Sequence, residues 1–91
     1  MTNDPRGRRL LISYDLRKPN FKEEDYMVLY TELQLLKAKR IQESVWVIRT
    51  KLDALELFER LQKYFHRNDR LLVVHIGGFR SRNGVNQIKR I

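Results

Sequence analysis

The stretch LLISYDL, residues 10–16, decides the fold that this sequence can adopt. It is short and rich in leucine, isoleucine and tyrosine, with charged residues on both sides and Pro19 soon after it, which predicts a strand. Side chains alternate between the two faces of a strand. The more apolar set, which we expect to face the helices, is Leu10, Ile12, Tyr14 and Leu16. The other set is Leu11, Ser13 and Asp15.

An amphipathic helix is predicted next, over residues 22–36. Glu23, Glu24 and Asp25 fall in its first turn, where the helix dipole favours acids. Apolar side chains recur at helical spacing, at Tyr26, Leu29, Tyr30, Leu33 and Leu36.

The segment RIQESVWVIRT, residues 40–50, is rich in β-branched and aromatic residues and is therefore expected to be extended. It is either one bent strand, or a short edge strand over residues 40–42 that turns at Glu43 and Ser44 into a central strand over residues 45–49. The sequence leaves both alternatives open.

A second helix and a last strand complete the pattern. Thr50 followed by Asp53 resembles a capping box and predicts a helix over residues 52–65. Its apolar face is marked by Leu55, Phe58, Leu61 and Phe65. Residues 66–69 are a connection, and the apolar run over residues 71–76, which two glycines follow, predicts a strand.

This order of elements predicts an α+β, ferredoxin-like fold (βαββαβ), with two helices on one face of an antiparallel sheet. The domain is expected over residues 9–78, between a basic N-terminal extension, residues 1–8, and a basic C-terminal tail, residues 79–91, which has the alternative of a short strand paired with a partner. Because both faces of the last strand are mostly apolar, a second copy is expected to cover the open sheet face and form a homodimer. The residues expected there with Asp15 are Leu11, Leu71, Val73 and His75.

The charge of the chain predicts a polyanionic partner. The 91 residues have a formal net charge of +8, and residues 77–91 carry four bases and no acid. Such basic ends either keep a small protein in solution or bind nucleic acid, DNA or RNA.

The absence of cysteine excludes disulfides and thiolate metal sites. The sequence has no secretion signal and no run long enough to span a bilayer, so we expect a cytoplasmic protein without a membrane partner.

Asp15 is the candidate for chemistry. On the open face of a twofold dimer, two Asp15 carboxylates could meet and bind a hard divalent ion, with Arg17 and Lys18 placed to receive phosphates. The alternative is a solvated acid that pairs with Arg17 or caps the following turn. Spacing alone does not decide between them.

The segments LLISYDL, KRIQESVWVIRT and NDRLLVVHIGG, with the helices between them, resemble the small CRISPR-associated (Cas) family that forms the dimeric core of the spacer-integration complex. They are also similar to the stand-alone relatives of that family, including virulence-associated toxin-like ribonucleases. The resemblance covers residues 10–78. Its most specific parts are the aspartate that ends the first strand and the Gln-x-Ser-Val-aromatic segment, that is Tyr14, Asp15, Gln42, Ser44, Val45 and Trp46.

The resemblance implies a ferredoxin-like homodimer in which Asp15 is the metal-binding acid, with Mg²⁺ or Mn²⁺ as the ion. Nuclease activity is not uniform across the family. The stretch after the first strand reads more like the stand-alone branch, and the end of the chain lacks the apolar closing strand that CRISPR members lay against their partner.

The expected function is therefore that of a homodimeric nucleic-acid-binding protein. If the protein is catalytic, we expect a divalent-metal-dependent endonuclease that acts on RNA or DNA. The alternative is a non-catalytic dimeric scaffold or interaction module that binds nucleic acid or another protein. Asp15 is the candidate catalytic and metal-binding residue. The candidate nucleic-acid contacts are Arg17, Lys18, Arg80, Arg82, Lys89 and Arg90. Structural roles are expected for His66, His75 and Trp46.

Overall fold

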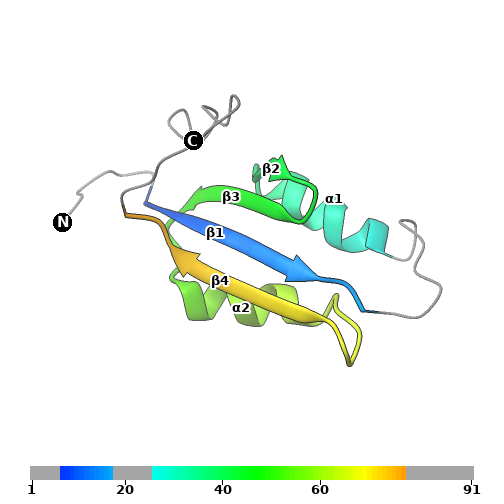
Figure 1. Cartoon of the computed structure of the whole chain (residues 1–91). Coiled ribbons are helices and arrows are strands. Elements are labelled where there is room, and N and C mark those ends of the chain that lie inside the picture. Colours follow the sequence, from blue (N-terminus) through cyan, green and yellow to red (C-terminus); the bar gives the residue numbers. More distant parts are fainter. Residues whose placement is uncertain (1–6, 18–25, 78–91) are drawn as a thin grey trace.

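The computed structural model describes residues 7–17 and 26–77 of the chain. The elements are, in order, β1 (Arg8–Asp15), α1 (Met27–Leu35), β2 (Lys39–Gln42), β3 (Val45–Thr50), α2 (Ala54–Gln62) and β4 (Arg70–His75) (Figure 1). The strands pair antiparallel in the order β2-β3-β1-β4. The predicted α+β class is confirmed, and the arrangement is compatible with a ferredoxin-like fold. Residues 1–6 of the predicted extension and the whole predicted tail lie outside the described residues.

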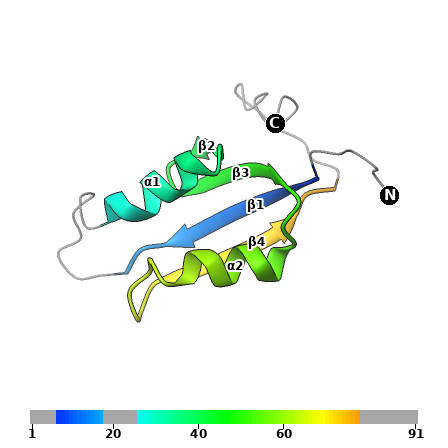
Figure 2. The same cartoon turned by 180° about the vertical axis from the view of Figure 1, so that it is seen from behind.

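Both helices cover one face of the sheet and leave the other face open, as the views from the two sides show (Figures 1 and 2). The core lies between the helices and the sheet. Its largest fully buried side chains include Leu10, Ile12, Tyr26, Leu29, Leu33, Ile48, Leu57 and Leu61. Neither helix of the described part of the chain is long and apolar enough to cross a membrane.

The register of the sheet decides which strand residues face the helices. Tyr14 and Ile12 of β1 are buried toward the helices, as their alternation predicts. The prediction for the last strand is wrong, because Leu71 lies opposite Tyr14 and Val73 lies opposite Ile12. Directly opposed residues point to the same side of a sheet. Leu71 and Val73 therefore pack against the core rather than lie on the open face.

The prediction for His75 is also wrong. This residue lies opposite Leu10, on the helix side, and does not share the open face with Asp15. Leu72 and Val74 take the open-face positions of β4 instead, with 56% and 37% of their surface exposed. The alternation of β4 could not reveal this, because both of its faces are apolar.

Of the two alternatives for residues 40–50, the one with two strands is correct. β2 and β3 form a hairpin that turns at Glu43 and Ser44. The pairing shifts register after Arg40, which is a β-bulge in the edge strand. Before the shift, Arg40 lies opposite Trp46, so both side chains belong to the helix side of the sheet.

The first helix is described over Met27–Leu35. α1 begins at Met27, and residues 22–25, where the prediction starts it, lie outside the described residues. It ends at Leu35, and Lys37 in the turn after it has a φ of 64°, in the left-handed region. The Ala38 N–H then donates to the Leu33 carbonyl at 2.9 Å, which satisfies the last turn and leads the chain directly into β2.

The second helix is capped by Asp53 and not by the predicted Thr50. Asp53 Oδ1 accepts a hydrogen bond from the Glu56 N–H at 2.8 Å, and Glu56 Oε1 accepts one from the Asp53 N–H at 3.3 Å. These reciprocal bonds form a capping box. The predicted apolar face is wrong at Leu55, which is exposed. The fully buried positions of α2 are Leu57 and Leu61.

Candidate nucleic-acid interface

Three apolar side chains of β1 and β4 lie together on the open face. Val74 is opposite Leu11, and Leu72 is opposite Ser13. We call Leu11, Leu72 and Val74 the apolar strip. Val47 of β3 shares this face beside Leu11 and is fully buried, so the exposed apolar surface lies over β1 and β4.

Three cations lie on the same face at one end of the sheet. Arg9 of β1 is directly opposite Arg49 of β3, and Lys39 of β2 is opposite Val47, two residues before Arg49. The Arg49 Nη1 donates to the Gly7 carbonyl at 3.0 Å, which fixes the position of this guanidinium. We call Arg9, Lys39 and Arg49 the basic corner. Sequence reasoning missed it, because only the strand register brings these residues together.

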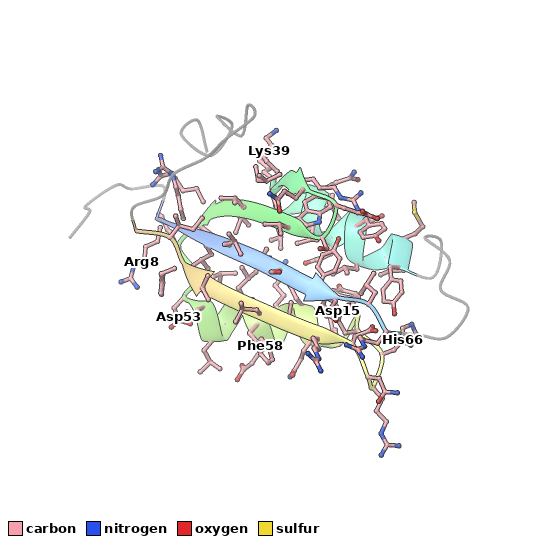
Figure 3. The ribbon with its side chains drawn as sticks, viewed as in Figure 1. Arg8, Asp15, Lys39, Asp53, Phe58 and His66 are labelled. Carbon is pink, nitrogen blue, oxygen red and sulfur yellow. The ribbon has the colours of Figure 1, made fainter. Side chains whose placement is uncertain are left out.

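Asp15 ends β1 on the open face, as predicted, at the end of the strand away from the basic corner (Figure 3). Its Oδ2 accepts a hydrogen bond from Arg17 Nη1 at 3.1 Å, and both side chains are about half exposed. Arg70 lies directly opposite Asp15 on β4. Asp15 therefore has one arginine as its ion-pair partner and another as its cross-strand neighbour. Because the pair is exposed, it contributes only about 0–1 kcal/mol to the stability of the fold.

The described residues of one chain do not form a metal site. Within them, no group of three or more His, Asp or Glu side chains is placed to hold one ion. Asp15 offers one carboxylate that is paired with Arg17, whereas Mg²⁺ is usually held by one or two carboxylates together with waters and substrate phosphates.

Of the six predicted nucleic-acid contacts, one lies within the described residues and five lie outside them. Arg17 is described and exposed at the end of β1. Five lie outside the described residues, namely Lys18, Arg80, Arg82, Lys89 and Arg90. Trp46 is buried in the core, as expected, and its Nε1 donates to the Tyr14 hydroxyl at 3.0 Å.

Asp69 was not singled out from the sequence, yet it joins three parts of the fold. Its Oδ1 accepts a hydrogen bond from the Arg17 N–H at 2.7 Å. Its Oδ2 accepts from the Tyr26 hydroxyl at 2.7 Å and from the His66 N–H at 2.8 Å. The sequence carries no signal for this role, because an aspartate in a polar connection looks like any turn residue and two of its partners are distant along the chain.

The bonds to Asp69 favour its charged form. Partial burial raises the pKa of its carboxyl group, but the hydrogen bonds from Arg17, His66 and Tyr26, together with the charge of His66, outweigh it. The pKa of Asp69 therefore lies below its ordinary value. The His66 ring also packs edge-on against the Tyr26 ring, with centroids 5.1 Å apart, which is a structural role as predicted.

No protein-family model matches this chain. The class of protein that the fold and the surface define is a small α+β protein whose open sheet face carries an apolar strip, with a basic corner at one end.

Asp69→Asn should lower the free energy of unfolding by about 1–3 kcal/mol at neutral pH, because an amide oxygen cannot replace both carboxylate oxygens. A depressed native pKa contributes stability above the unfolded pKa that is lost as the pH falls through the native value. The difference between wild type and variant should therefore shrink from about pH 7 to about pH 3 in urea unfolding experiments.

Asp53→Asn is the matched control, because asparagine caps a helix as well as aspartate does. An Asp69→Asn deficit that is equal at both pH values would show that the charge of Asp69 does not stabilise the fold.

Proposed function

We propose that this protein is a homodimeric nucleic-acid-binding protein of the kind that its resemblance to the small CRISPR-associated family implies. The observation that carries the proposal is the pairing of Arg9 with Arg49 beside the apolar strip, on one open face. This arrangement supports an apolar contact between two copies and a cationic rim that receives phosphates.

The basic corner is suited to a polyanion. Arg9 and Arg49 stand directly opposite each other with Lys39 on the neighbouring strand, so three cationic side chains gather on one part of this face. A phosphate placed there would be attracted by all three. Arginine is suited to this task, because its planar donors match phosphate oxygens in pairs.

The apolar strip supports the dimer. Leu72 keeps more than half of its surface exposed in one copy, in line with Val74 and Leu11. Burying apolar surface stabilises an interface by about 25 cal/mol for each Å². Because interfaces combine an apolar centre with a polar rim, the arrangement of the strip and the corner fits this use.

Leu72→Glu should convert a dimer into a monomer without unfolding the chain, because the side chain lies on the open face. Leu55→Glu is the matched control, since Leu55 is as exposed but lies on α2, on the other side of the sheet. Sedimentation at tens of micromolar protein measures both. A monomeric wild type, or equal dissociation by both variants, would contradict the dimer.

Replacing Arg9 and Arg49 together by Gln should weaken binding to nucleic acid and flatten its salt dependence. For each phosphate that the variant no longer neutralises, the slope should fall by about 0.9 log units on duplex DNA and about 0.7 on a single strand. The control is the double replacement of Lys63 and Arg67 by Gln, which removes the same charge from the end of α2 and the loop after it. Equal losses in both variants would mean that net charge alone, and not the basic corner, drives binding.

Metal-dependent cleavage is a narrower proposal, supported by the position of Asp15 on the open face. In a dimer through that face, the Asp15 carboxylates of two copies could supply oxygen ligands to one ion. The ion would polarise a phosphodiester, and Arg17 and Arg70 would hold its phosphate oxygens. If the wild type binds nucleic acid and never cleaves it, the function is that of a non-catalytic scaffold.

Asp15→Asn should abolish cleavage that depends on Mg²⁺ or Mn²⁺ while changing stability by about 0.5 kcal/mol or less, as is usual for an exposed residue. RNA and duplex DNA are tested with metal and with chelator. Glu59→Gln is the control, since it removes an exposed carboxylate from α2 and should leave cleavage intact. Cleavage that survives in Asp15→Asn would show that Asp15 is not its acid.

A further inference from the structure

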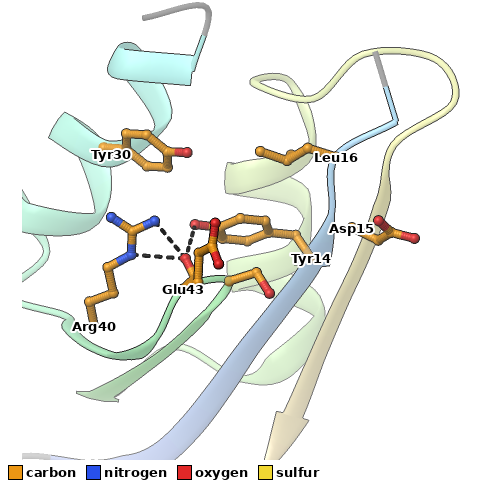
Figure 4. A pocket seen from close by; sticks show the side chains of 7 residues that line it. Tyr14, Asp15, Leu16, Tyr30, Arg40 and Glu43 are labelled. Carbon is orange, nitrogen blue, oxygen red and sulfur yellow. Dashed lines mark hydrogen bonds between the residues drawn. The ribbon is translucent and has the colours of Figure 1, made fainter. Parts of the chain in front are cut away.

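The two edges of the sheet differ in how they exclude a further strand. β2 forms one edge and β4 forms the other, as the strand order and the views from the two sides show (Figures 1 and 2). The β2 edge carries the cations Lys39 and Arg40, and a bulge interrupts its pairing after Arg40. Figure 4 shows the Arg40 guanidinium bonded to the carbonyl of Glu43 in the hairpin turn, where Nε donates at 2.9 Å. Charges and bulges of this kind keep other strands away from an edge.

Along the described strand β4, none of these devices is present. Its residues 71–74 are LLVV, no proline interrupts it, and its pairing with β1 runs without a bulge. Within the described residues, β1 is the only strand that pairs with β4. Leu72 and Val74 are exposed there. An exposed apolar edge with unpaired backbone groups favours pairing with another chain.

A hydrogen bond between the two ends of this strand pair identifies the backbone groups that point outward from β4. The Ile76 N–H donates to the Arg9 carbonyl at 3.0 Å, so the backbone of Ile76 faces β1. The N–H and C=O groups of successive residues in an antiparallel strand point to alternate edges. Every second residue before Ile76 therefore also bonds toward β1. The residues between them direct their N–H and C=O groups to the outer edge, namely Leu71, Val73 and His75.

From this arrangement we infer that the outer edge of β4 pairs antiparallel with the same edge of a second copy, about a twofold axis at Val73. With the axis there, Val73 lies opposite its own copy, and Leu71 lies opposite His75 of the other copy. All three outward-pointing residues then form hydrogen-bonded pairs, which exchange about six bonds in total. The axis is perpendicular to the sheet, so the helices of both copies lie on one side and the two sheets join into one.

The side chains of β4 fit this register. Leu72 of each copy lies opposite Val74 of the other on the open face, which places an apolar pair on each side of the axis. Cross-strand pairs of this kind stabilise a sheet. Arg70 is the one arginine or lysine of β4, and it lies opposite Ile76 of the other copy. Although each chain has a net charge of +8, the pairing therefore brings no two such cations directly opposite each other.

This edge contact goes beyond the open-face contact of the proposed function. It uses the outward backbone groups of β4, whereas the open-face contact uses the side chains of the apolar strip. The edge contact also joins the strips of two copies into one continuous apolar surface, because Leu72 and Val74 line both sides of the axis. Two such pairs that stack through their open faces form a tetramer.

Cysteine cross-linking tests the register, because the chain has no cysteine of its own. Opposed residues outside the hydrogen-bonded pairs have Cα atoms about 4.5 Å apart, which is within the range of a disulfide. Leu72→Cys and Val74→Cys should therefore link to each other rapidly when the two variants are mixed and mildly oxidised. Each variant alone should link more slowly, because diagonal neighbours lie about 7–8 Å apart.

Leu11→Cys mixed with Leu72→Cys is the matched control. Leu11 belongs to the apolar strip, but it lies on β1, so about two strand spacings of 4.8 Å separate it from β4 of the other copy in the edge contact. This mixture should not link through the edge. A contact through the open face alone brings the whole strip to the second copy and links position 11 as readily as position 74.

His75→Pro should weaken self-association about tenfold or more in sedimentation, because proline has no N–H and the lost bond occurs twice in the dimer. The His75 N–H points away from β1, and its side chain lies on the helix side, so the pairing within one copy and the open face are unchanged. His75→Thr keeps the N–H and should associate as the wild type does. Thermal melting establishes that both variants are folded.

The inference is overturned if positions 72 and 74 link no faster than positions 72 and 11, or if His75→Pro and His75→Thr associate equally. Duplex DNA separates this result from the proposed function. Binding of duplex by a protein whose β4 edges do not link leaves the proposed function standing and removes the inference. Linked β4 edges in a protein that binds no nucleic acid do the reverse.

Discussion

The carboxylate of Asp69 is the interaction on which the junction of β1, α1 and α2 at one end of the sheet depends. It accepts hydrogen bonds from Arg17 after β1, from Tyr26 before α1 and from His66 after α2. One side chain therefore fixes where the chain leaves the first strand and where it enters the first helix. The strand end carries Asp15, so Asp69 holds this end of β1 against the start of α1.

Local patterns predicted the elements, and the pairing of strands decided what the patterns left open. The alternation of β1 is one-sided, so Leu10, Ile12 and Tyr14 could be assigned to the core from the sequence. The alternation of β4 is not, and Leu71 and Val73 were assigned to the wrong face until the register with β1 was known. A shift of one residue moves every side chain to the other face of the sheet. When both faces of a strand are apolar, its own sequence therefore cannot show which side chains face the core.

The candidate site shows the same division. Asp15 could be placed on the open face because it lies on the polar side of β1, and its pair with Arg17 was one of the two alternatives that the sequence offered. Arg70 beside it could not be foreseen, because it follows only from the cross-strand pairing. Arg9 and Arg49 attract no notice in the sequence, where each is an ordinary base at a strand end. Their concentration of positive charge exists only in the folded sheet.

The edge strand β2 places cations on both faces of the sheet, because successive residues of a strand point to opposite faces. Lys39 lies opposite Val47 on the open side, whereas the next residue, Arg40, lies on the helix side over Tyr30. Cations at an edge also discourage another strand from adding to the sheet, and the bulge after Arg40 reinforces this effect. This edge of the sheet therefore carries a cation on each of its two faces.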